Sequence, residues 1–95
     1  MPLFVVTCVD KPGHAPVRAA NRDAHLEFVR AAGRAVVVAG PTLTDDLAGM
    51  NGSVLVLDFP DRAAVEAHLA RDPYSLAGLF ESVTIKPFKL VIDNR

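Results

Sequence analysis

His25 and Asp72 are the two side chains of this 95-residue sequence whose types could together transfer a proton. An imidazole titrates near neutral pH and can act as a general base, and a carboxylate can hold an imidazole in one tautomer. In a helix, spacings of three and four residues would place His25 on one flank with Arg18, Arg22 and Val29, at the border between core and solvent. The same position also fits a half-buried histidine that only packs against the edge of a sheet.

Asp72 has a structural and a functional interpretation, and the two are compatible. It follows the predicted last turn of a helix, where the helix dipole disfavours an anion by ~0.3–1 kcal/mol, so another interaction should offset that cost. The order Asp72-Pro73-Tyr74 is typical of an N-cap and first helical turn, and it predicts a short helix through Leu79. The carboxylate could equally hold a histidine in one orientation.

Three further features could belong to the same site. Gly40-Pro41 either ends a strand or lets a ligand approach the backbone closely, and we expect the strand end. Tyr74, the only tyrosine, could contribute its hydroxyl to the site or anchor the short helix with its ring. Arg22 lies one helical turn before His25 and could bind a carboxylate or phenolate.

The other histidines and the cysteine predict no additional chemistry. His14, His25 and His68 show no HxxxH or HxH spacing, so we expect no metal site. Cys8 lies within a predicted strand, where a thiol is typically an inert packing residue. A lone cysteine also excludes an internal disulfide.

Hydrophobic periodicity predicts four strands and two main helices, in the order β-α-β-β-α-β. The strands are expected at 3–9, 35–39, 53–59 and 83–92, and the period of the last one slips at Pro87, which indicates a bulge or a sheet edge. The second helix is expected from its N-cap Asp61 to about Arg71. The first helix begins at Pro16 and stops at Gly33, and its apolar stripe is Val17, Ala20, Ala24, Phe28 and Ala31.

This order predicts a single ferredoxin-like α+β domain over residues 1–95, with both helices on one face of a four-stranded antiparallel sheet. Strands one and three nevertheless carry apolar residues on both faces, for example Val5 beside Val6 and Val56 beside Leu57. Two helices on one side cannot cover both faces. We therefore expect a homodimer in which the second face packs against its own copy.

Composition excludes several classes of function. A net charge of −1 and few aromatic residues provide neither a basic field nor a stacking surface for nucleic acid. The start of the chain lacks a signal-peptide pattern, and no apolar run is long enough for a membrane span, so we expect a cytoplasmic protein. With 51% hydrophobic and 22% charged residues, the chain should fold rather than remain disordered.

Several short stretches together resemble the YCII (YciI-like) family. They span nearly the whole chain and are residues 10–14 (DKPGH), 22–26 (RDAHL), 39–41 (AGP), 52–53 (GS), 72–74 (DPY), 77–81 (AGLFE) and 85–88 (IKPF). The resemblance implies a dimeric α+β barrel with a paired histidine and aspartate as its active site. Carried over by motif, these residues are His25 and Asp72, while Gly40, Pro41 and Ser53 are implied as pocket positions.

The resemblance implies lyase-like chemistry in one known case, the removal of halide from a hydroxylated quinol ring. We therefore expect a small-molecule enzyme, acting as a lyase or isomerase on a small cyclic or aromatic acid, in which His25 moves a proton and Asp72 orients it. Such a reaction needs no cofactor. The alternative is a non-catalytic ligand-binding or dimerisation module, because a dimeric barrel encloses a cavity whether or not it reacts.

Overall fold

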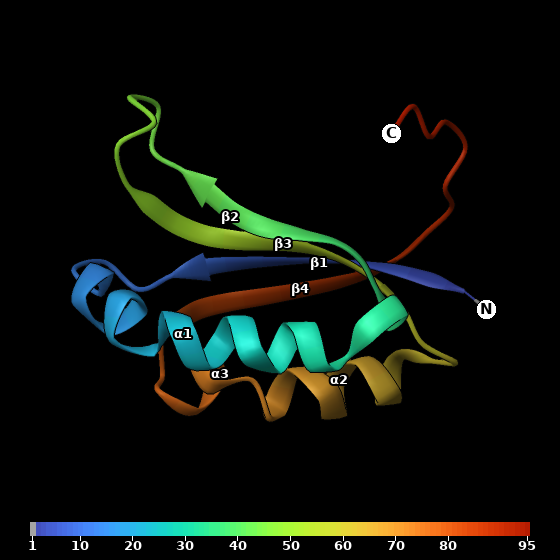
Figure 1. The fold of residues 1–95 in the computed structure, drawn as a ribbon, viewed down its shortest axis with the longest axis horizontal. Helices are drawn as coiled ribbons and strands as arrows, with labels where there is room; N and C mark the ends of the chain where they lie inside the picture. The colour runs from blue at the N-terminus through green and yellow to red at the C-terminus, as the bar shows by residue number, and fades with distance from the viewer. Residues whose placement is uncertain (1) are drawn as a thin grey trace.

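A computed structural model describes residues 2–95, and it confirms the ferredoxin-like α+β fold (Figure 1). The four strands form one antiparallel sheet in the order β2-β3-β1-β4. The elements in chain order are β1 (Leu3–Asp10), α1 (Ala15–Ala31), the short 3-10 helix η1 (Gly33–Ala35), β2 (Val36–Leu43), β3 (Met50–Asp58), α2 (Arg62–Ala70), α3 (Pro73–Leu76) and β4 (Phe80–Phe88).

The core lies between the sheet and the helices, which cover the same face (Figure 1). Alternate residues of the two central strands point toward the helices because side chains along a strand alternate between the two faces. The α2 helix contributes Val65 and Leu69, which are buried against these strand residues. From β1 and β3, the core contains Phe4, Val6, Cys8, Leu55 and Leu57.

Strand β2 continues beyond Gly40-Pro41, so the prediction that this pair ends the strand is wrong. Gly40 lies opposite Val54 and Pro41 opposite Ser53, and the strand runs on to Leu43. Proline is tolerated here because β2 is an edge strand, where a missing N–H need not interrupt a ladder. The extension therefore places both residues beside Val54 and Ser53 of β3.

Strand β4 begins and ends earlier than predicted, at Phe80 and Phe88. It forms the other edge of the sheet, as the Pro87 signal indicated, but its pairing with β1 is regular there. The register shift lies at the opposite end, where Val9 faces Ser82 and Asp10 faces Phe80. Residues 89–95 form a tail beyond β4.

The side of helix α1 that faces the core is shifted by about one residue from the predicted apolar stripe. Ala20 and Ala24 are exposed, whereas Arg18 is the buried residue of this helix, with 4% of its surface accessible. An arginine can occupy such a position only when its charge and N–H groups have partners, and Asp10 supplies one. The flank that carries Arg18, Arg22 and His25 therefore faces inward.

The second face of the sheet carries no helix (Figure 1). Val38 and Val9 are 40% and 45% exposed on it, and Val5, Val54 and Val56 are only partly buried. The tail approaches this face at one end, where Arg95 Nη1 donates a hydrogen bond to the Val37 carbonyl. Among the helices of residues 2–95, none is long and apolar enough to cross a membrane.

Candidate active site

His25 and Asp72 are in direct hydrogen-bonding contact. The Nδ1 atom of His25 lies 2.8 Å from Oδ1 and 3.0 Å from Oδ2 of Asp72. An ionised carboxylate can only accept hydrogen bonds, so Nδ1 carries the proton and donates it to Asp72. This assigns the tautomer of the neutral imidazole and leaves Nε2 with the free lone pair.

Asp72 performs both predicted roles at once. It is the N-cap of α3, and its Oδ1 accepts a 2.9 Å hydrogen bond from the backbone N–H of Tyr74. Only 3% of its surface is accessible. The helix therefore holds the carboxylate rigidly while the carboxylate holds His25. The predicted short helix ends at Leu76 rather than Leu79, because Gly78 adopts a left-handed φ of 70°.

Tyr74 packs its ring against the imidazole. The ring centroids of His25 and Tyr74 are 3.9 Å apart and their planes differ by 10°. The edge of Phe80 contacts Tyr74 from another side, at a centroid distance of 6.0 Å. Burial raises the pKa of Tyr74 above its ordinary value, against the opposing influence of Arg18 and Arg22. The phenol is therefore neutral at physiological pH.

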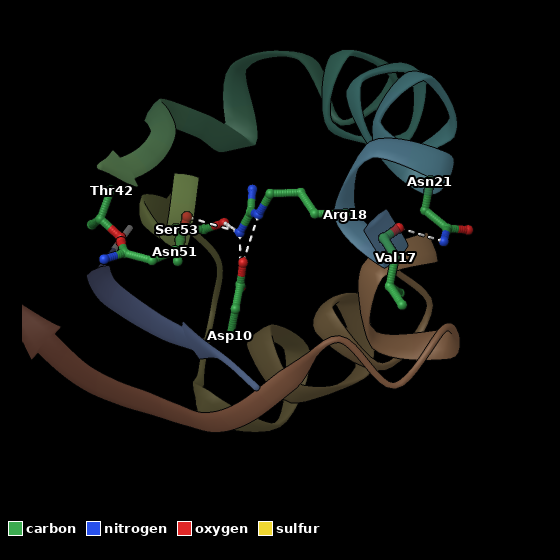
Figure 2. A network of polar contacts seen from close by, with 8 residues as sticks. Asp10, Val17, Arg18, Asn21, Thr42, Asn51 and Ser53 are labelled. Atoms are coloured by element: carbon green, nitrogen blue, oxygen red, sulfur yellow. Dashed lines mark hydrogen bonds and ion pairs between the residues drawn. The ribbon is translucent and has the colours of Figure 1, made fainter. Parts of the chain in front are cut away.

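Arg18 occupies the centre of a buried polar network, shown in Figure 2. Its Nε and Nη2 atoms donate to the two oxygens of Asp10, at 2.7 and 2.9 Å. Nη2 also donates to the carbonyl of Gly52 at 2.8 Å and to Ser53 Oγ at 3.0 Å. The guanidinium carbon lies 4.6 Å from the centroid of the Tyr74 ring. Arg18 thus links α1 to the ends of β1 and β3 and to the aromatic stack.

Gly52 allows β1 and β2 to pack closely against β3 on either side of it. A Cβ atom on Gly52 would lie 2.3 Å from the Cys8 carbonyl oxygen and 2.6 Å from Thr42 Oγ1. The first of these is a backbone atom that cannot move aside without shifting β1. A side chain at position 52 would therefore displace the carbonyl to which Arg18 binds.

One cavity of about 200 Å³ joins the candidate residues. It contains His25, Arg22, Gly40, Pro41, Ser53 and Tyr74, so the structure brings together every predicted site residue except Asp72, which lies behind His25. The remaining lining residues are Arg18, Leu26, Val29, Arg30, Ala39, Met50 and Leu55.

Two polar members of this region were not selected from the sequence as site residues. Arg18 shares the helical spacing of Arg22 and His25, so that pattern could have identified it. Asp10 shares the two-residue period of the buried residues Phe4, Val6 and Cys8, so the alternation of β1 could have placed it on the helix-covered face, but nothing local indicated Arg18 as its partner. The role of Asp10 depends on its long-range contact with Arg18 of α1.

The other ionisable residues contribute little to the cavity. Burial raises the pKa of the Cys8 thiol to about 12, which keeps it protonated, in agreement with a packing role. His68 lies against Phe28 and Phe59, at centroid distances of 4.7 and 5.2 Å. Within residues 2–95, no three His, Cys, Asp or Glu side chains are grouped so that they could hold a metal ion.

Fold and cavity together place the chain in a class of small ferredoxin-like α+β domains with a buried His/Asp pair beside a partly apolar cavity. The model of the YCII-related domain matches residues 2–89, and the chain belongs to this family. The resemblance seen in the sequence is thereby confirmed.

Curated relatives and solved structures agree with this assignment. Protein YciI of Escherichia coli O6:H1 is 35% identical over 97 residues, covering 94% of this chain and 98% of that protein. An uncharacterized protein of Haemophilus influenzae is 33% identical over 95 residues, covering 93% and 97%.

Among solved structures, 5-chloro-2-hydroxyhydroquinone dehydrochlorinase (TftG) from Burkholderia phenoliruptrix AC1100, in complex with 2,5-dihydroxybenzoquinone, is 34% identical with a TM-score of 0.85, and the match covers 92% of this chain and 93% of that one. An antibiotic biosynthesis monooxygenase has a TM-score of 0.58 at 16% identity, with 97% and 100% covered, and shares the fold alone.

Proposed function

We propose that this protein is a small-molecule enzyme in which His25 transfers a proton and Asp72 orients the imidazole and stabilises its protonated form. The observation that carries the proposal is the double contact of Nδ1 with Asp72, at 2.8 and 3.0 Å, on a histidine that also lines the cavity. Because Nδ1 is occupied, Nε2 is the nitrogen available to a ligand. A general base held in this way typically contributes 10²–10⁴-fold to a rate.

The proposed step is removal of a proton from a saturated carbon next to a carbonyl of the substrate, such as that of the ketone tautomer of a phenol. The C–H bond breaks, the proton passes to Nε2 of His25, and the electron pair moves onto the conjugated oxygen. Return of the pair expels a leaving group, such as a halide, from the carbon next to the deprotonated one and forms a C=C bond in a lyase reaction, or recovers a proton at another carbon in an isomerisation. No electrons enter or leave the substrate, so the step balances without a redox cofactor.

A small cyclic or aromatic acid is the substrate class that we propose. An apolar cavity of ~150 Å³ in another protein accommodates benzene, and about 200 Å³ leaves room for ring substituents. Arg22 lines the cavity and can bind an acidic group. The similar dehydrochlorinase acts, by its name, on a hydroxylated and chlorinated ring.

We also propose that the protein is a homodimer through the open face of its sheet. That face is apolar along β1, β2 and β3, and the single chain leaves Val9 and Val38 about two-fifths exposed. A second copy would bury these side chains, and the resemblance to the YCII family implies a dimeric barrel.

The test of the catalytic proposal is turnover of chlorinated hydroxyhydroquinones by the wild type and by His25→Ala. We expect halide release by the wild type and a loss of at least about 100-fold in the variant. Equal rates would contradict the role of His25. Tight binding of these compounds with no turnover by the wild type would instead favour a non-catalytic ligand-binding module.

A further inference from the structure

We propose that Arg18 forms a buried anion subsite in the cavity, at which its Nη1 atom binds an acidic oxygen of the ligand. This inference extends the proposed function by assigning the residue that recognises the substrate's negative charge. It rests on that function for the identity of the ligand as a substrate. The subsite itself would also serve a protein that binds without reacting.

The hydrogen bonds of Arg18 to Asp10, Gly52 and Ser53 are all formed by one side of its guanidinium, and a further side-chain hydrogen bond joins Arg18 to the Tyr74 hydroxyl. Nε and Nη2 bind the carboxylate of Asp10, and Nη2 binds Gly52 and Ser53 in addition. Nη1 makes none of these bonds. Figure 2 shows this nitrogen directed away from Asp10. The Arg18 side chain is 95% buried and lines the cavity, and Asp10, Gly52 and Ser53 do not compete with a ligand for its Nη1 atom.

The charge of the cavity favours an anion. Three arginines and His25 line it, and no aspartate or glutamate does, although the chain as a whole has a net charge of −1. The carboxylates of Asp10 and Asp72 pair with Arg18 and His25, but neither carboxylate lines the cavity. Within residues 2–95, Arg22 and Arg30 form no salt bridge. The lining therefore carries uncompensated positive charge next to apolar side chains.

Arg18 is better suited than Arg22 to bind the reacting oxygen. Arg22 is exposed, so its charge is screened by water and its side chain must lose freedom on binding. Arg18 is already ordered by four hydrogen bonds, so a ligand at Nη1 needs little reorganisation. Tyr74, which stacks on His25 and lies beneath Arg18, fixes the guanidinium relative to the imidazole.

This arrangement gives the ligand a defined orientation. An oxygen conjugated to the reacting carbon would lie at Arg18 while that carbon faces Nε2 of His25. When the proton moves to His25, the electron pair moves toward Arg18, where a fixed positive charge stabilises it. The inferred substrate is therefore a planar ring whose conjugated carbonyl oxygen becomes an anion at Arg18. A ring that already carries a carboxylate or phenolate there should bind as a ligand with the same charge.

Binding of 2,5-dihydroxybenzoate and of its neutral amide, 2,5-dihydroxybenzamide, tests the subsite without turnover. By calorimetry we expect the wild type to bind the acid at least about 10-fold more tightly than the amide. The variant Arg18→Lys keeps a charge for Asp10 but loses Nη1, and we expect about 10- to 100-fold weaker binding of the acid with less than about 3-fold change for the amide. The matched control is Arg34→Lys, an exposed arginine outside the cavity, which should change neither.

Two results would overturn the subsite. One is equal binding of acid and amide by the wild type, which needs no variant and so does not depend on the folding of Arg18→Lys. The other is loss of acid binding in Arg22→Gln together with unchanged binding in a folded Arg18→Lys. Failure of the proposed catalysis has a different signature, since His25→Ala would then match the wild type in turnover while the preference for the acid persists.

Discussion

The phenol ring of Tyr74 lies face to face with the imidazole of His25, with 3.9 Å between centroids and 10° between planes. Asp72 binds the edge of the same imidazole at Nδ1. Stacking on Tyr74 thus fixes the plane of the imidazole, and the hydrogen bond to Asp72 fixes its rotation within that plane. Because Asp72 also caps the helix on which Tyr74 lies, the two restraints form one rigid unit.

Tyr74→Phe and Tyr74→Ala separate the ring from the hydroxyl. Phenylalanine keeps the stack, so we expect its free energy of unfolding to remain within about 1 kcal/mol of the wild type. Alanine removes a side chain that is 1% exposed, and we expect a loss of about 3–5 kcal/mol in urea unfolding. An equally small loss in both variants would show that the stack does not stabilise the fold.

Asp72→Asn tests whether the carboxylate orients His25. Asparagine can still cap α3, but its amide can donate to Nδ1 and so favour the wrong tautomer. We expect turnover of the substrate to fall on the order of 10²–10⁴-fold, while the thermal midpoint changes only slightly. The measurement is the steady-state rate, with circular dichroism as the check on folding.

Asp61→Asn is the matched control for that experiment. Asp61 caps α2 through a hydrogen bond from Ala64 N to its Oδ1, as Asp72 caps α3, but it contacts no histidine. Its replacement should leave the rate unchanged. A similar loss of rate in both variants would assign the effect to helix capping instead.

Val56→Asp tests the homodimer. Val56 lies on the open sheet face opposite Val5 and Val38, so a charge there would be buried at the interface without a partner. By sedimentation at low micromolar concentration we expect a dimer for the wild type and a monomer for the variant. The control Ala20→Asp, on the exposed side of α1, should remain dimeric. A monomeric wild type would contradict the proposal.

His68 should make the fold less stable in mild acid. Burial is the main cause that lowers the pKa of His68, with Arg71 acting in the same direction and Asp72 against it. The unfolded chain, with a histidine pKa of about 6.5, therefore binds this proton more readily than the folded chain. The contribution of neutral His68 is complete above that value and is lost as the pH falls through the folded-state pKa.

Denaturant unfolding between about pH 7 and about pH 5 measures this effect. His68→Phe preserves an aromatic ring against Phe28 and Phe59, and we expect its stability to decline less with falling pH than that of the wild type. His14→Gln is the control, because His14 binds the Pro12 carbonyl on the surface and should leave the slope unchanged. Identical slopes in all three proteins would exclude His68 as the cause.

The order of strands and helices was predictable from the sequence because it depends on local patterns. The apolar run of β1, the cap at Asp61 and the Asp72-Pro73 start of α3 all act within a few residues. The open sheet face was visible in the same way, since the alternation of side chains along a strand shows how much apolar surface two helices leave uncovered.

Tertiary structure decided the contacts between segments that are distant in the chain. His25 and Asp72 are 47 residues apart. In the sequence, only the family resemblance indicated that they form a pair, because no local pattern connects them. The inward rotation of α1 depends on Asp10, Gly52 and Ser53, which satisfy the N–H groups of Arg18. An amphipathic stripe cannot reveal this, because a buried charge is stable only where non-local partners offset the cost of removing it from water.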